Sequence, residues 1–129
     1  MIGAESTALA PREAALAREV RFGTWRFVLQ RASAAVLALC VVVHLATIIY
    51  AVRHGLTAEA IVARVHASVF WPAFYAVFVV AVAIHAPLGL RVVAEEWLQW
   101  RGRSLDGALG ALALVLLGGG FYAVYSLAA

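Results

Sequence analysis

The sequence predicts an all-α integral membrane protein with three transmembrane helices. The chain has 129 residues, of which 65% are hydrophobic and only 13% are charged, and its mean hydropathy is +0.93. A soluble domain of this length cannot bury so much apolar surface, so the bilayer must act as part of the solvent. Three apolar stretches, at about 30–52, 69–92 and 105–127, each have the roughly 20 residues that a helix needs to cross a membrane. We expect these helices to be part of a larger transmembrane helix bundle.

A charged, alanine-rich segment precedes the first apolar stretch. Both this segment and the apolar run after it are too long for a cleavable signal peptide. We therefore expect a cytoplasmic N-terminal segment at 1–24, with an amphipathic helix on the membrane or on a partner, followed by a membrane domain at 25–129. The charged residues of the segment are Glu5, Arg12, Glu13, Arg18, Glu19 and Arg21.

The second apolar stretch contains two prolines and is flanked by two polar connections. Pro72 lies in its first turn, where proline is tolerated, whereas Pro87 lies near its end and predicts a kink. The first connection, at 56–67, reads as a short linker. The second, at 91–103, holds two tryptophans among charged residues, which is typical of a loop at the membrane interface.

The distribution of arginine predicts the orientation of the chain. Eight arginines lie before or at the start of the first stretch, or at or after the end of the second; two lie between these stretches, and none follows the third. Because cytoplasmic loops carry the excess of basic residues, the N-terminus should be cytoplasmic. The eight are Arg12, Arg18, Arg21, Arg26, Arg31, Arg91, Arg101 and Arg103, and the two are Arg53 and Arg64.

Several other classes of function find no support in the sequence. The single cysteine, Cys40, rules out a disulfide framework and a multi-cysteine metal site. The arginines are scattered around apolar segments rather than clustered, which argues against nucleic-acid binding. No catalytic triad, phosphate loop or dinucleotide fingerprint is present. Gly107, Gly110 and the glycines at 118–120 lie within an apolar stretch, so they predict close helix packing.

The strongest candidate for a functional residue is His85, near the end of the second stretch. A histidine inside an apolar helix is costly in lipid and therefore suggests a function. Gly89 lies one turn later on the same face and leaves room for a flat, bulky group, and Arg91 follows where a carboxylate could be held. A metal ligand, a residue without a side chain and a cation, in this order along one helix, are what one edge of a b-type haem pocket requires.

The first stretch carries polar side chains on one helical face. Interhelical hydrogen bonding explains most of them, but His44 lies deep inside the stretch and could instead be a haem ligand. The residues of this face are Gln30, Ser33, Leu37, Cys40, His44 and Thr47.

His44 and His85 are not expected to bind the same haem. At ~1.5 Å per residue, His44 lies roughly 18 Å from the cytoplasmic side and His85 roughly 9 Å. Two axial ligands of one haem should lie at similar depths. His85 is therefore expected to pair with a histidine of another chain, and His44 is either a ligand of a second haem or a polar structural residue.

The motif His85-x-x-x-Gly89-x-Arg91, followed by Glu96, resembles the second-helix motif of the cytochrome b membrane anchor of succinate dehydrogenase and fumarate reductase. The resemblance implies that His85 is an axial ligand of the haem iron and that Arg91 lies near the haem propionates. Val92 stands where the family often has a second histidine.

The segment Gln30-Arg31-Ala32-Ser33 resembles the start of the first helix in the same family. The resemblance implies that Arg31, Ser33 and Gln30 line a quinone site. Gln30 replaces a histidine that is common in the family, and Ala34 replaces a glycine, so the number of haems and the details of the quinone site stay open.

The resemblance implies one subunit of a succinate:quinone oxidoreductase, the respiratory complex II that joins the tricarboxylic acid cycle to electron transport. A flavoprotein would oxidise succinate, and an iron–sulfur protein would pass electrons to quinone at the cytoplasmic membrane of a bacterium. This chain would carry no flavin or dehydrogenase site. It would hold one or two haem b groups, form part of the quinone site, and pair with a second anchor chain or with its own copy.

Two other functions compete with this interpretation. A membrane subunit of another b-type cytochrome, such as that of a formate dehydrogenase or hydrogenase, usually has more spans or more histidines. A haem-free small membrane accessory protein would leave His85, Gly89 and Arg91 without a common purpose.

Overall fold

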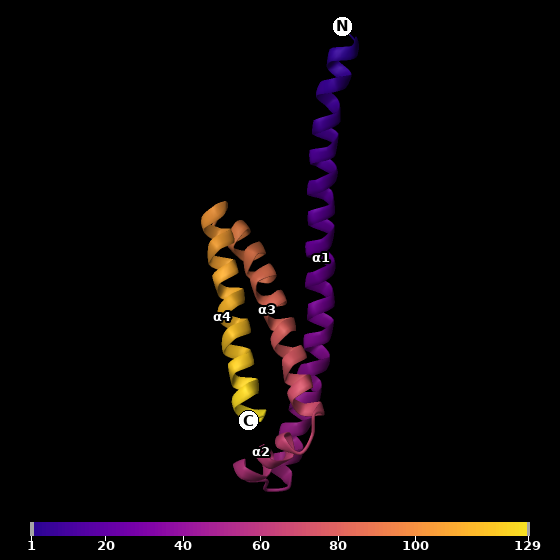
Figure 1. Cartoon of the computed structure of the whole chain (residues 1–129). Coiled ribbons are helices and arrows are strands. Elements are labelled where there is room, and N and C mark those ends of the chain that lie inside the picture. The colour runs from indigo at the N-terminus through magenta and orange to yellow at the C-terminus, as the bar shows by residue number, and fades with distance from the viewer. Residues whose placement is uncertain (1, 129) are drawn as a thin grey trace.

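The computed structural model describes residues 2–128, with the side chains of residue 9 and of residues 11–128. Four helices occupy this part of the chain: α1 (Ile2–Arg53), α2 (Ala58–His66), α3 (Phe70–Trp97) and α4 (Arg103–Ala128) (Figure 1). Within the described residues, α1, α3 and α4 are the helices long and apolar enough to cross a membrane. The predicted fold class, an all-α protein with three transmembrane helices, is confirmed.

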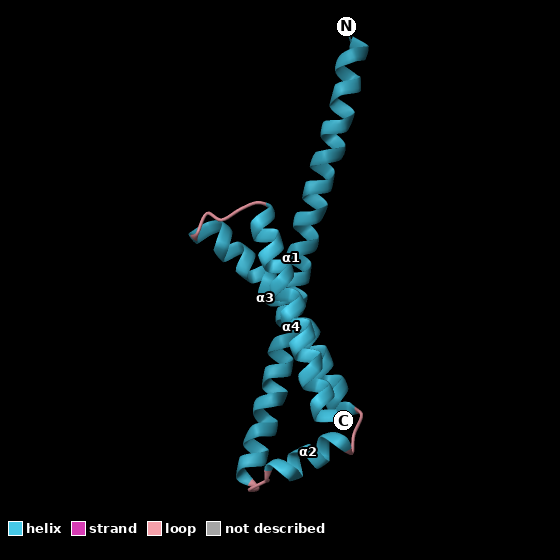
Figure 2. Ribbon diagram, turned by 60° about the vertical axis from the view of Figure 1, so that its left-hand side comes forward, coloured by secondary structure: helices cyan, strands magenta, loops and turns pink. Residues whose placement is uncertain are grey.

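The three long helices lie side by side with α3 in the middle, in contact with both α1 and α4 (Figure 1). Short loops join successive helices (Figure 2), so α3 runs antiparallel to α1, and α4 runs antiparallel to α3. Few side chains are buried, and most of those are small or lie where α3 meets α4; Leu105 (1% exposed) packs there with Ala94 and Leu109. Most of each apolar helix surface therefore faces outward, as it can in lipid or against other subunits.

Helix α1 has 52 residues and passes through the charged segment into the apolar stretch without a break. The described part of the segment at 1–24 is thus continuous with the transmembrane helix rather than a separate element. The N-terminal part of α1 projects past the ends of α3 and α4 (Figure 1).

The second transmembrane stretch, predicted at about 69–92, forms α3, but the connection predicted at 91–103 is shorter than expected. α3 continues to Trp97, and the loop is confined to residues 98–102. Pro87 lies inside α3 and does not end it; prolines are tolerated within transmembrane helices. The ion pair between Arg91 and Glu95, one turn apart, supports the last turns.

The linker predicted at 56–67 contains a helix, α2, that the sequence analysis missed. Thr57 caps its start by accepting a hydrogen bond from the Ala60 N–H at 3.3 Å, and Val65 is buried. Glu59 lies in the first turn, where a hydrogen bond from its own backbone N–H and a second from the Thr57 hydroxyl lower the pKa of its carboxyl group.

The glycines of α4 differ in what surrounds them. A Cβ atom on Gly120 would lie 2.5 Å from Val79 Cγ1, so this glycine allows α4 to approach α3 closely. A Cβ atom on Gly107, Gly110 or Gly119 would meet no heavy atom within 4 Å, and the same is true of Gly118. Close packing within the chain therefore depends on Gly120, and the other glycines face outward.

We predict that Gly120→Ala destabilises the contact between α3 and α4. The new methyl group would overlap Val79, whose β-branched side chain has little freedom to move, and overpacking of this kind costs about 1–3 kcal/mol. Thermal unfolding of the purified protein in detergent measures the effect. The control is Gly119→Ala, which adds the same methyl group in open space; equal stability of the two variants would contradict the prediction.

Candidate functional site

The contact between α1 and α3 brings the two sequence motifs together. Ser33 on α1 and His85 on α3 are 52 residues apart in sequence, yet Ser33 Oγ lies 3.4 Å from His85 Nδ1. Ser33 is 6% exposed and His85 is half-buried. The side chain predicted to bind haem and one predicted to line the quinone site are therefore direct neighbours.

One helical turn away, Gln30 packs against Gly89. A Cβ atom on Gly89 would lie only 3.1 Å from Gln30 Nε2, so a larger residue there would force the glutamine to move. The other amide atom, Gln30 Oε1, is buried and has no hydrogen-bond partner among the described residues. Because a buried acceptor without a partner is costly, this oxygen is a candidate for binding a ligand that donates a hydrogen bond.

The Ser33 hydroxyl also makes a hydrogen bond within its own helix. Its hydroxyl donates to the backbone carbonyl of Gln30 at 3.1 Å. A carbonyl oxygen three residues back is a common partner for serine in a helix. The hydroxyl therefore lies between its own helix and the imidazole of His85.

Arg91 joins α3 to α4. Its guanidinium forms ion pairs with Glu95, at 3.3 Å, and with Asp106 at the start of α4. The side chain of Arg91 is 21% exposed, so these partners hold it in a partly buried position. Two carboxylates of the protein thus contact the cation that the sequence analysis assigned to the haem propionates.

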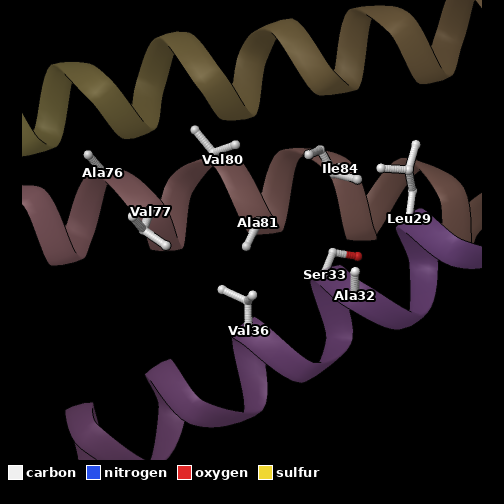
Figure 3. Close-up of a pocket in the computed structure, with 9 residues that line it drawn as sticks. All are labelled: Leu29, Ala32, Ser33, Val36, Ala76, Val77, Val80, Ala81 and Ile84. Carbon is white, nitrogen blue, oxygen red and sulfur yellow. The ribbon is translucent and has the colours of Figure 1, made fainter.

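Two cavities flank the contact between α1 and α3. The first, of about 420 Å³, is an apolar groove between the two helices, and Figure 3 shows Ser33 as the one labelled side chain in it that carries an oxygen. Its lining residues are Leu29, Ala32, Ser33, Val36, Ala76, Val77, Val80, Ala81 and Ile84. The second, of about 300 Å³, is lined by Gly23, Arg26, Phe27, Gln30, Leu88, Arg91, Val92 and Glu95.

The second cavity contains polar residues that the sequence analysis did not assign to a site. Arg26 and Glu95 line it together with Gln30 and Arg91. Arg26 lies four residues before Gln30, so the helical period could have placed them on one face. Glu95 lines this cavity because α3 continues past the predicted end of the helix.

Arg31 lies outside both cavities. It is exposed, and its guanidinium lies over the ring of Phe27 at 5.7 Å from the centroid. Its predicted contact with quinone stays a prediction.

His44 lies at a different level of the structure from His85. Its ring contacts Tyr75 edge to face at a centroid distance of 6.0 Å. Tyr75 precedes His85 by ten residues on α3, or about 15 Å along the helix. The two histidines therefore lie at different levels, with a separation along the helix larger than the roughly 9 Å expected from the sequence.

Comparison with known proteins identifies the family of the chain. A family model described as the succinate dehydrogenase/fumarate reductase transmembrane subunit matches residues 5–127, a range that holds both motifs and all three transmembrane helices. Neither the curated proteins nor the solved structures gave a match to the chain. On the family match, which covers most of the sequence, this chain belongs to the succinate dehydrogenase/fumarate reductase transmembrane subunit family.

Proposed function

We propose that the chain binds haem b through His85 and forms part of the quinone site of its complex with Gln30, Arg31 and Ser33. The observation that supports this most directly is the contact between α1 and α3, where Ser33 faces His85 and Gln30 packs on Gly89. In this family, the enzyme is a complex of this membrane subunit with flavoprotein and iron–sulfur subunits.

The residues around His85 fit a haem. The imidazole contacts Ser33 through Nδ1, which leaves Nε2 as the coordinating atom. The adjacent groove is lined by small and aliphatic side chains, including Ala32 and Ala81, which would accept a porphyrin edge and exclude water. When bound, haem supplies a one-electron redox centre in the membrane.

The second axial ligand is expected from another chain. His44 lies about 15 Å from the level of His85, so the described residues offer no second histidine at the same depth. A second anchor subunit or a second copy of this chain would supply the ligand. Either partner would also cover the apolar surface that the three helices leave exposed.

Gly89 and Arg91 are proposed to flank the haem edge, as the motif implies. Gly89 adds no side chain of its own, but the Gln30 amide fills the space over it, so a haem edge there would have to lie beside that amide. A guanidinium has five N–H donors, so Arg91 keeps donors for a propionate while it pairs with Glu95 and Asp106. The two ion pairs would hold the guanidinium in place for that role.

The quinone site is proposed at the cavity beside Gln30. The buried Gln30 Oε1 would accept a hydrogen bond from a quinol hydroxyl, and it has no partner among the described residues. Arg31 does not line this cavity, but its guanidinium lies over the ring of Phe27, which does; after turning toward the cavity it would donate to a quinone carbonyl and stabilise negative charge as the quinone is reduced by the iron–sulfur subunit. The arginine distribution predicts a cytoplasmic N-terminus, which would put this cavity on the cytoplasmic side of the membrane.

His44 is proposed as the ligand of a second haem, with a structural role as the alternative. A cavity of about 140 Å³ lies against it, and its lining includes Thr47, Tyr75 and, from α2, Arg64. A histidine and an arginine on one cavity would suit a haem iron and its propionate, but the cavity would have to widen to admit a haem. The same contacts would suit a histidine that only packs against Tyr75.

We predict that His85→Ala removes the b-type absorption of the purified complex. The measurement is a reduced-minus-oxidised spectrum of the wild type, His85→Ala and His44→Ala. Loss with His85→Ala alone indicates one haem, and partial loss with each variant indicates two. His66→Ala, at an exposed site in α2, is the control and should keep the full signal. A wild-type complex without an α-band would contradict the proposed function.

We predict that Gln30→Asn raises the KM for quinone about 2- to 10-fold, which corresponds to one lost hydrogen bond of about 0.5–1.5 kcal/mol. The shorter side chain withdraws the amide from the cavity. Succinate oxidation with a water-soluble dye should not change, because the dye does not need the quinone site. The matched control is Gln99→Asn in the exposed loop before α4, where asparagine tolerates the φ of 50°. An unchanged KM in Gln30→Asn would exclude Gln30 from the site.

A further inference from the structure

We propose that Ser33 is a positioning residue for His85: its hydroxyl accepts a hydrogen bond from Nδ1–H and thereby keeps the lone pair of the imidazole on Nε2. The sequence motif assigns Ser33 to the quinone, whereas the structure places its hydroxyl against the histidine ring. This inference rests on the proposed role of His85 as a haem ligand.

The direction of the hydrogen bond follows from the number of protons. A serine hydroxyl has one proton, and Ser33 donates it to the Gln30 carbonyl at 3.1 Å. Toward His85, at 3.4 Å, Ser33 Oγ can therefore only accept. A neutral imidazole has one N–H, so the donor must be Nδ1–H, and Nε2 is left unprotonated. An unprotonated nitrogen is the form of histidine that coordinates iron.

The apolar surroundings of Ser33 favour its hydrogen bonds over contacts with water. Ser33 is 6% exposed and lies at an apolar groove, where no side chain other than its own among the lining residues brings a polar group. Water is scarce at such a place in a membrane, so the carbonyl and the imidazole have little competition for the hydroxyl. The hydrogen bond also ties the ring to α1, so the orientation of the imidazole depends on the packing of two helices.

A hydrogen bond of this kind should tune the bound metal as well as orient its ligand. A partner that accepts from the distal N–H of a coordinating histidine makes the histidine a stronger electron donor. A stronger donor favours the oxidised form of iron. Removal of the Ser33 hydroxyl should therefore raise the midpoint potential of the haem and shift its α-band.

The test uses the intact membrane complex with three variants. Ser33→Ala removes the hydroxyl, and Ser33→Thr keeps it. Ser126→Ala on α4 is the matched control, because Ser126 also donates to a carbonyl of its own helix, that of Tyr122 at 2.9 Å, but is exposed. The readouts are the haem midpoint potential from a redox titration, the position of the α-band, and the KM for quinone.

We expect a higher midpoint potential and a shifted α-band in Ser33→Ala, whether or not its KM for quinone also rises, and wild-type haem properties in Ser33→Thr and Ser126→Ala. A raised KM with wild-type haem properties would mean that Ser33 contacts quinone, which overturns the inference and leaves His85 as the haem ligand. A wild-type complex without haem overturns the proposed function and the inference together. If Ser33→Ala does not assemble, Ser33→Cys, with a weaker acceptor, should shift the potential in the same direction, and no shift would overturn the inference.

Discussion

The antiparallel contact between α1 and α3 is the constraint on which the candidate site depends. In lipid, the hydrophobic effect does not drive helices to associate, so close packing of small residues and buried hydrogen bonds must hold them together. Here Gly89 admits the side chain of Gln30, and Ser33 contacts His85 one turn away. A shift of either helix by one turn would break both contacts at once. The proposed haem ligand would then no longer lie next to the proposed quinone residues.

The chain has the surface of a subunit rather than of a complete membrane protein. α3 contacts both other long helices, but large apolar side chains remain exposed along all three. A Cβ atom on four glycines of α4 would meet no neighbouring helix within 4 Å among the described residues, and the N-terminal part of α1 projects beyond α3 and α4. These surfaces suit a member of a family whose proteins work in a multisubunit complex.

Sequence reasoning predicted what depends on local composition and missed what depends on contacts. The three spans follow from hydropathy, and the histidine–glycine–arginine motif is visible in one helix. The last turn of α3, from 93 to Trp97, was missed because the ion pair of Arg91 with Glu95 supports it rather than hydropathy. α2 was missed because a helix of nine residues is too short to show a clear hydrophobic period. The contact of Arg91 with Asp106 and that of Ser33 with His85 both require the register of two helices, which no single segment reveals.

A cryo-electron microscopy map of the intact complex in lipid would test the proposed site most directly. We expect a haem whose iron is bound by His85 Nε2, with Ser33 against Nδ1 and Gln30 against Gly89 in the same contact of α1 with α3. A map in which these two helices pack in another register, or in which the chain contributes no ligand at His85, would contradict the proposed site.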